Sequence, residues 1–279
     1  MNIIVTLNRN YIPPLTVMMT SLLQNNSGVF VSFYILHSSL QEEDFLYIQR
    51  HVPFANYRVV GTEVPHGFME DAPVLFHYTK EMYYRIFAAE LLPPDVDKAL
   101  YLDPDMIIIN PLDILYSMEL GDNLFAAAKS PNPLTQKRFI KRLGMPEDAE
   151  YFNSGVLLMN LAKLRERDDH AAIAQYIEEN GDILLLPDQD ILNVFYNSNT
   201  IILDSNIYNF DARYYRVLSM LPPISQDENW IDENTIVIHY CGKNKPWHKK
   251  YQGVLGKYYR EYQKLCETLS KQPKTPDKQ

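Results

Sequence analysis

The stretch KALYLDPDMIII, residues 98–109, is an apolar run interrupted by two carboxylates, Asp103 and Asp105. Such a run is typical of a buried strand, where a carboxylate is costly unless it is paired, hydrogen-bonded or bound to a cation. Residues i and i+2 of an extended chain point to the same face, so the two carboxylates can converge on one ion. Pro104 suits this geometry and predicts that the strand ends here. The pattern predicts a divalent metal site, with an acidic turn between two strands as the alternative.

The chemistry of this pair points to a phosphate-bearing ligand. Carboxylate oxygens select hard cations, and Mg²⁺ and Mn²⁺ commonly lie between acidic side chains and the phosphates of a substrate. The apolar runs on both sides of the pair place it at the carboxyl end of a strand, where open α/β sheets bind ligands. We therefore predict a metal–diphosphate site.

A later apolar strand, predicted over Thr235–His239, ends in a histidine and is followed by a loop. His239 as a third ligand would favour Mn²⁺ over Mg²⁺, because Mg²⁺ prefers oxygen ligands. In the loop, Gly242 permits close backbone approach, and Lys243 or Lys245 could neutralise a leaving diphosphate. The alternative is a structural histidine followed by two solvated lysines.

The composition excludes several classes of protein. The 279 residues are 46% hydrophobic and carry a formal net charge of −9, which argues against nucleic acid as the main partner. The chain contains no run of about 18 apolar residues and does not begin with a basic segment, so we predict a cytoplasmic protein. Cys241 and Cys266 lack the spacing of a zinc or redox motif. No Gly-x-Gly-x-x-Gly or Walker-type phosphate loop is present.

Strand and helix patterns alternate along the chain, which indicates an α/β fold with a mixed, mostly parallel sheet flanked by helices. We predict one domain over residues 1–252, then a C-terminal amphipathic helix and a disordered tail over residues 253–279. The predicted strands are Asn2–Leu7, Phe30–Leu36, Tyr57–Val60, residues 98–109, Leu124–Ala128, Tyr151–Asn160 and Thr235–His239. The predicted helices are one opening at Pro13-Pro14, Gln41–His51, Lys80–Leu92, Leu134–Leu143, Asp188–Tyr196 with an Asp cap, and Gly253–Leu269.

Three polar residues are embedded in apolar stretches: Arg85 in YYRIF, Asn153 in YFNSG and Gln189 beside Asp188. Each is a candidate ligand for a substrate. The alternative is that each satisfies a backbone group or a buried carboxylate in the core, and that Asp188 only caps its helix.

Taken together, these pieces resemble glycosyltransferase family 8, particularly the bacterial retaining galactosyl- and glucosyltransferases of surface polysaccharide assembly. The resemblance covers about residues 1–250 and rests on six blocks in the order of the family. These blocks are Asn8-Arg9-Asn10-Tyr11, Tyr84-Arg85, Leu100-Tyr101-Leu102-Asp103-Pro104-Asp105, residues 151–161 (YFNSGVLLMNL), Asp188-Gln189-Asp190-Ile191-Leu192-Asn193, and His239-Tyr240-Cys241-Gly242 with Lys245-Pro246-Trp247.

The resemblance implies a GT-A-type fold, a UDP-sugar donor and transfer with retention at the anomeric carbon. It also implies Mn²⁺, with Mg²⁺ as the alternative, held by Asp103, Asp105 and His239. The remaining implied roles are uridine binding by Thr6, Asn8 and Asn10, diphosphate binding by Asp103, Gly242 and Lys245, and contact with the sugar and reaction centre by Arg85, Asn153, Asp188 and Gln189.

Two departures from the family pattern concern substrate choice. Asn8 and Arg9 stand where many members carry acidic residues, and Lys129-Ser130 stands where related enzymes often place an acidic sugar-binding residue. The donor sugar, glucose or galactose, therefore stays open. Residues 67–79 and 212–228 are candidate acceptor-side loops, because they are long, contain proline and lack a regular pattern.

The primary hypothesis is a Mn²⁺-dependent hexosyltransferase whose partners are a UDP-hexose donor and a saccharide, lipid-linked or protein-linked glycan acceptor. The alternatives are a self-glucosylating primer resembling glycogenin and a sugar-nucleotide-binding protein without turnover. The basic and aromatic residues 257–265 also suggest weak peripheral contact with the inner face of the membrane, with a solvated helix that closes the domain as the alternative.

Overall fold

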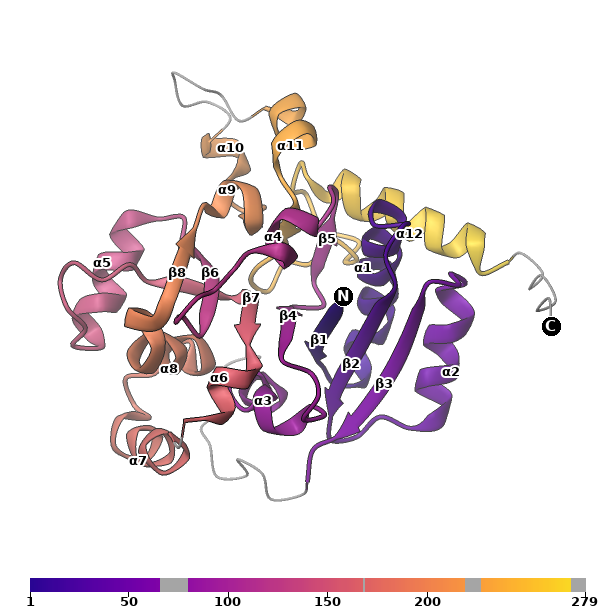
Figure 1. Cartoon of the computed structure of the whole chain (residues 1–279). Helices are drawn as coiled ribbons and strands as arrows, with labels where there is room; N and C mark the ends of the chain where they lie inside the picture. Colours follow the sequence, from indigo (N-terminus) through magenta and orange to yellow (C-terminus); the bar gives the residue numbers. More distant parts are fainter. Residues whose placement is uncertain (66–79, 168, 219–226, 272–279) are drawn as a thin grey trace.

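The computed structural model describes residues 1–65, 80–167, 169–218 and 227–271 (Figure 1). Within these ranges a seven-stranded sheet has the order β3-β2-β1-β4-β7-β6-β8, and a three-stranded sheet has the order β5-β10-β9. The strands are β1 (Asn2–Thr6), β2 (Val31–His37), β3 (Tyr57–Glu63), β4 (Lys98–Leu102), β5 (Met106–Ile108), β6 (Phe125–Lys129), β7 (Phe152–Asn160), β8 (Thr200–Leu203), β9 (Phe210–Asp211) and β10 (Val237–His239).

Helices cover both faces of the large sheet (Figure 1). The helices are η1 (Arg9–Tyr11), α1 (Ile12–Asn25), α2 (Glu42–His51), η2 (Lys80–Arg85), α3 (Ala88–Leu91), α4 (Asp113–Ser117), α5 (Pro133–Arg142), α6 (Leu161–Arg165), α7 (His170–Asn180), α8 (Pro187–Tyr196), η3 (Asn197–Asn199), α9 (Ser205–Tyr208), α10 (Tyr215–Leu218), α11 (Glu228–Asn234) and α12 (Gly256–Leu269). The predicted α/β class with a mixed sheet is confirmed. Within the described seven-stranded sheet, only β7 runs antiparallel to its neighbours, β4 and β6.

Alternate residues of the central strands face opposite cores, as the two-residue period of a strand requires. Ile4 and Tyr101 pack with the core that includes η2, α3 and α8. Ile3 and Leu100 pack with the core beneath α1 and α2. Because both faces are buried, the central strands are apolar throughout.

The order of strands places a ligand-binding edge beside the predicted metal pair. The chain runs outward from β1 to β2 and β3 on one side, and β4 pairs with β1 on the other side. This reversal is a topological switch point, outside which open α/β sheets bind ligands. Thr6 ends β1 and Leu102 ends β4, so Asp103 lies at this edge.

The strand predicted over residues 98–109 is interrupted after Leu102, just before Asp103 and Pro104, and its second half enters another sheet. β4 ends at Leu102, whereas β5 pairs antiparallel with β10 in the small sheet. The predicted strands included β5 and β10 but not the two-residue β9, and no local pattern indicates that these three strands pair as a separate sheet.

The helix predicted over Lys80–Leu92 is wrong as one continuous element. The segment forms the 3₁₀ helix η2 and then the short helix α3, separated by Ile86 and Phe87. Both side chains between the two helices are buried, as are Tyr83, Tyr84 and Arg85. The segment thus lacks the exposed polar face of a regular surface helix.

The helix predicted over Asp188–Tyr196 is confirmed to within one residue, but its predicted Asp cap is wrong. The N-cap position is Leu186, which makes no side-chain capping bond, and Asp188 lies in the first turn. The Asp188 carboxylate instead points to Arg85 and Ser154. Helix α7 was missed altogether by the sequence analysis.

The C-terminal helix α12 packs along α1 (Figure 1). Tyr258, Tyr259 and Cys266 are buried, and the Tyr262 hydroxyl accepts a hydrogen bond from Asn25 Nδ2 at 2.7 Å. No helix in the described ranges is long and apolar enough to cross a membrane. The domain boundary at residue 252 stays a prediction, and of the tail predicted to be disordered over residues 270–279, residues 272–279 lie outside the described residues.

Candidate active site

A cleft of about 420 Å³ lies at the switch point, where side chains of both sheets meet. It brings together nearly all the residues singled out in the sequence. Those that line it are Thr6, Asn8, Arg85, Asp103, Asp105, Asn153, Asp188, Gln189, His239, Gly242 and Lys245. Asn10 is exposed and does not line the cleft; its backbone N–H donates to Asn8 Oδ1 at 3.0 Å.

Asp103, Asp105 and His239 converge at one end of this cleft. Pairing of β5 with β10 sets Met106 opposite His239, which brings the histidine next to the aspartates. His239 Nε2 lies 3.3 Å from Asp105 Oδ1 and 3.7 Å from Asp103 Oδ2. One ligand atom from each of the three residues lies within 4.8 Å of the others.

These residues fit a hard divalent cation that also accepts imidazole. Gly155 of β7 supplies the space, because a Cβ at this position would lie 2.6 Å from His239 Cε1 and 2.8 Å from Asp103 Oδ2. The β7 backbone also positions Asp103, whose N–H donates to Gly155 O at 2.9 Å. The structure thus favours the metal-ligating interpretation of the Asp-Pro-Asp motif over a simple acidic turn.

Lys245 places a positive charge beside the three candidate metal ligands. Its ammonium donates to Asp105 Oδ2 and, at 3.0 Å, to Tyr240 O. Burial disfavours the ionised form of Asp105, but Lys245 and His239 more than offset this and lower the pKa of its carboxyl below the ordinary value. Asp105 is therefore ionised and ready to accept a cation.

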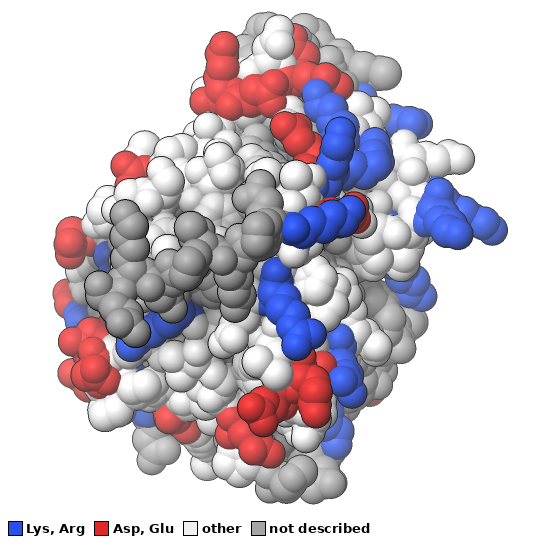
Figure 2. Space-filling view, turned by 90° about the vertical axis from the view of Figure 1, so that its right-hand side faces the viewer, with Lys and Arg blue, Asp and Glu red and all other residues white. Residues whose placement is uncertain are grey.

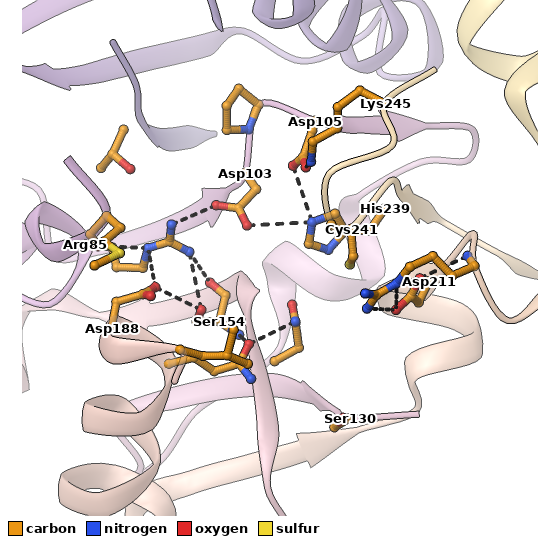
Figure 3. Close-up of a pocket in the computed structure, with 18 of the residues that line it drawn as sticks. Arg85, Asp103, Asp105, Ser130, Ser154, Asp188, Asp211, His239, Cys241 and Lys245 are labelled. Atoms are coloured by element: carbon orange, nitrogen blue, oxygen red, sulfur yellow. Dashed lines mark hydrogen bonds and ion pairs between the residues drawn. The ribbon is translucent and has the colours of Figure 1, made fainter. Parts of the chain in front are cut away.

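Arg85 links the candidate metal ligands to the opposite wall of the cleft (Figure 3). Nη2 lies 3.0 Å from Asp103 Oδ1, Nε lies 3.1 Å from Asp188 Oδ2, and Nη1 donates to Ser154 O at 3.0 Å. The guanidinium also lies 4.4 Å from the centre of the Tyr101 ring. Burial opposes the charge of Arg85, but its carboxylate partners raise its pKa above the ordinary value. Arg85 thus holds two carboxylates of the cleft in fixed positions.

The opposite wall is formed by Asn153 on β7 and Gln189 on α8. Gln189 Oε1 accepts from Asn153 Nδ2 at 2.9 Å and from Ser154 N–H at 3.1 Å. Asn153 Oδ1 accepts from Gly155 N–H at 2.9 Å and from Asn209 Nδ2 at 2.7 Å. Asn153 and Gln189 thus fit both interpretations given in the sequence analysis. Their side chains accept hydrogen bonds from backbone N–H groups, and they also line the cleft where a substrate could contact them.

Several lining residues had no individual role in the sequence analysis, including Tyr11, Asp211, Arg213 and Cys241, although Tyr11 and Cys241 stand in the family-like blocks and Arg213 lies in a predicted acceptor loop. Arg213 forms a fork with Asp211 and lies over Gly242, whose φ of +84° favours glycine. Asn209 does not line the cleft but is buried and accepts from His239 Nδ1 at 2.9 Å. A weak indication of Asn209, Asp211 and Arg213 in the sequence was the run Asn-Phe-Asp-Ala-Arg, residues 209–213, in which polar residues flank an aromatic side chain.

Comparison with known sequences decides the family. The pattern of Glycosyl transferase family 8 matches residues 2–251. The chain belongs to this family. It is a glycosyltransferase, as the sequence analysis predicted, and the resemblance on which that prediction rested is confirmed.

Curated relatives align over most of the chain. Lipopolysaccharide 1,2-glucosyltransferase of Escherichia coli K12 is 28% identical over 263 residues, covering 93% of this chain and 76% of the relative. General stress protein A of Bacillus subtilis is 24% identical and covers 88% of this chain and 87% of the relative.

The fold agrees with solved structures. The galactosyltransferase LgtC, solved with donor and acceptor sugar analogues, superposes with a TM-score of 0.83 at 26% identity, covering 98% of both chains. This match confirms the predicted GT-A-type fold. GlyE of Streptococcus pneumoniae, at 22% identity and a TM-score of 0.71, shares the fold over 96% of this chain and 62% of its own.

The departures from the family pattern fall on different parts of the site. Asn8 and Ser130 line the cleft, whereas Lys129 and Arg9 are exposed. Arg9 is 2.8 Å from Asp44, a contact outside the cleft. Of the predicted acceptor loops, residues 67–79 and 219–226 lie outside the described residues.

Proposed function

We propose that this family 8 enzyme is a Mn²⁺-dependent retaining transferase that moves glucose or galactose from a UDP-sugar to a glycan acceptor. The observation that carries the proposal is the convergence of Asp103, Asp105 and His239 beside Lys245 at the switch point. Two carboxylates and an imidazole suit Mn²⁺ better than Mg²⁺, which prefers oxygen ligands. A lysine directly beside them supplies a further positive charge for a diphosphate.

The diphosphate would lie between the metal ligands and the Gly242–Lys245 loop. Held by Asp103, Asp105 and His239, Mn²⁺ would stabilise the negative charge that develops on the leaving UDP. Lys245 would donate to the phosphate oxygens, and Gly242 would let the backbone approach them, because it carries no Cβ. Thr6 and Asn8 line the β1 end of the same cleft and would contact the uridine, with Asn10 holding the Asn8 side chain.

The donor sugar would lie against Asp188, Asn153 and Gln189, with Arg85 holding Asp188 in place. Gln189 Oε1 already accepts two N–H bonds, which makes this neutral amide a weak nucleophile. We therefore favour front-face displacement. The bond from the anomeric carbon to the phosphate oxygen breaks, the acceptor oxygen bonds on the same face, and the acceptor proton passes to the departing phosphate.

The relatives suggest the class of acceptor. One relative is named for glucosyl transfer to lipopolysaccharide, and LgtC is a galactosyltransferase solved with an acceptor sugar analogue. A saccharide or a lipid- or protein-linked glycan of the cell surface is the acceptor we propose.

Contact with a membrane through α12 stays a prediction. Tyr258 and Tyr259 are buried against the protein, whereas Arg260 and Lys264 are exposed. Figure 2 views the side that carries α2 and α12, where Lys and Arg side chains gather on the right-hand part of the face. Contact of α12 with anionic lipid would therefore depend on the charges of Arg260 and Lys264 rather than on the buried tyrosines.

The test measures UDP release from a panel of UDP-sugars in Mn²⁺, in Mg²⁺ and in EDTA. We expect release to need Mn²⁺, to prefer one UDP-hexose and to disappear in Asp105→Asn. Asp122→Asn is the matched control, because Asp122 pairs with Lys163 at the surface.

Two outcomes would contradict the proposed metal site, and two others would favour an alternative function. Release without added metal, or equal release by Asp105→Asn and the control, would mean that the acidic pair is not a metal site. Growth of the protein's own mass in UDP-glucose would favour the self-glucosylating primer, and binding of a UDP-sugar without release would favour the non-catalytic alternative.

A further inference from the structure

A chain of hydrogen bonds connects the metal end of the cleft to the sugar end. His239 Nδ1 lies 2.9 Å from Asn209 Oδ1, and Asn209 Nδ2 lies 2.7 Å from Asn153 Oδ1. Asn153 Nδ2 in turn lies 2.9 Å from Gln189 Oε1. Four side chains that are far apart in the sequence are thus linked in series.

Two backbone N–H groups determine the direction of every bond in this chain. Gly155 N–H can only donate, so the Asn153 atom it meets at 2.9 Å is the oxygen, and the Asn153 amide nitrogen faces Gln189. Ser154 N–H likewise meets Gln189 Oε1. Both amides are therefore oriented by the β7 backbone rather than by an arbitrary choice of rotamer.

The same logic continues to the histidine. Because Asn153 presents an oxygen, the Asn209 group that meets it must be the NH₂, which leaves the Asn209 oxygen facing His239. An oxygen accepts, so His239 Nδ1 carries a proton. His239 Nε2 is then the nitrogen directed at Asp103 and Asp105, as a metal ligand requires.

The fold places Asn209 at this junction. Asn209 follows α9 and directly precedes β9, which pairs in parallel with β10 so that Asp211 lies opposite His239. Asn209 is 4% exposed and His239 is also 4% exposed, so solvent does not compete for their hydrogen bond.

We propose that Asn209 is a positioning residue that sets the metal-binding tautomer of His239 and, at the same time, the orientation of Asn153 and Gln189. The inference rests on the metal site of the proposed function, but it assigns a role to a residue that touches neither metal nor substrate. An aspartate at this position would still accept from His239 and would no longer donate to Asn153. The two ends of the chain can therefore be separated by one substitution.

The first test measures Mn²⁺ binding in the presence of UDP. The electron paramagnetic resonance signal of free Mn²⁺ reports how much Mn²⁺ stays unbound. Asn209→Leu should weaken Mn²⁺ binding roughly 10- to 100-fold, as is typical when the partner of a metal-ligating histidine is removed. Nitrogen-15 NMR of histidine-labelled protein in Mg²⁺ should show the Nδ1-protonated tautomer of His239 in the wild type and its loss in Asn209→Leu.

The second test uses Asn209→Asp, with Asn206→Asp on α9 as the control. Asn209→Asp should bind Mn²⁺ at least as tightly as the wild type, while its kcat for donor hydrolysis falls roughly 10-fold or more because Gln189 and Asn153 are misplaced. The control should change neither quantity.

Two results would overturn the proposal. One is Mn²⁺ affinity that falls as much in Asn209→Asp as in Asn209→Leu, since a residue needed only for packing would behave in this way. The other is an unchanged kcat in Asn209→Asp. If no UDP-sugar is hydrolysed by the wild type, the proposed function fails, and Mn²⁺ binding with the His239 tautomer still decides the role of Asn209.

Discussion

Lys245 Nζ donates a hydrogen bond to Asp105 Oδ2 across 140 residues of sequence. The Lys245 ammonium thus already contacts a carboxylate of the candidate metal site. A metal ion must either share Asp105 with this ammonium or displace it. Since both Lys245 and Asp105 are buried, the repulsion between the ammonium and the metal is poorly screened. The arrangement favours metal binding together with a diphosphate, whose negative charge offers Lys245 another partner.

Lys245→Met should therefore have opposite effects on two ligands. We expect Mn²⁺ alone to bind more tightly, by about tenfold or about 1.4 kcal/mol, because a neighbouring positive charge is removed. UDP in saturating Mn²⁺ should bind more weakly by a similar factor. Calorimetric titration measures both affinities, and Lys249→Met on the exposed loop controls for the loss of charge. A parallel weakening of both ligands would show that Lys245 acts only through the fold.

Gly155→Ala should disturb the candidate metal site through a steric clash, because Gly155 lies on β7 directly beside His239 and Asp103. The new Cβ would lie 2.6 Å from His239 Cε1, so the histidine or the β7 backbone must move. We expect Mn²⁺ affinity to fall by about tenfold or more, together with a loss of roughly 1–3 kcal/mol in the free energy of unfolding. Gly28→Ala is the control, because nothing lies within 4 Å of its Cβ position. Mn²⁺ binding equal to that of the control would show that the site is looser than the structure indicates.

Asp190→Asn should lower stability more than any surface Asp→Asn change. Asp190 is fully buried and accepts from the Arg142 guanidinium, the Tyr151 hydroxyl and the N–H groups of Leu185 and Leu186. An amide cannot accept all these donors, and it leaves the Arg142 charge without its partner. We expect a loss of about 3–5 kcal/mol in the free energy of unfolding, measured by urea denaturation.

The control for Asp190→Asn is the same substitution at exposed Asp182. It should change the free energy of unfolding by no more than about 0.5 kcal/mol. Equal stability of the two variants would mean that the cluster around Asp190 contributes nothing net. Because Asp190 sits one residue after Gln189, donor hydrolysis by the folded fraction of Asp190→Asn should fall as well.

The parts of the site that could be predicted are those that follow from local pattern. Asp103 and Asp105 stand two residues apart in an apolar run, which identified them as a pair, although the structure places them in the turn between β4 and β5 rather than within one strand. His239 ends another apolar strand in the same way. Arg85, Asn153 and Gln189 could be noticed as polar residues in apolar surroundings, but their partners could not be named, since each lies tens of residues away in sequence.

The sequence by itself determined the alternation of strands and helices, the two buried faces of the central sheet, the strand end just before Pro104 and the chemistry of the candidate metal ligands. These features depend on the period and polarity of neighbouring residues. Tertiary structure decided the break in the predicted Lys80–Leu92 helix, the Lys245–Asp105 contact and the link from His239 through Asn209 to Gln189. These depend on the order and register of strands, and only strand pairing brings Asn209, Asn153 and His239 within hydrogen-bonding distance, because no local sequence period connects them.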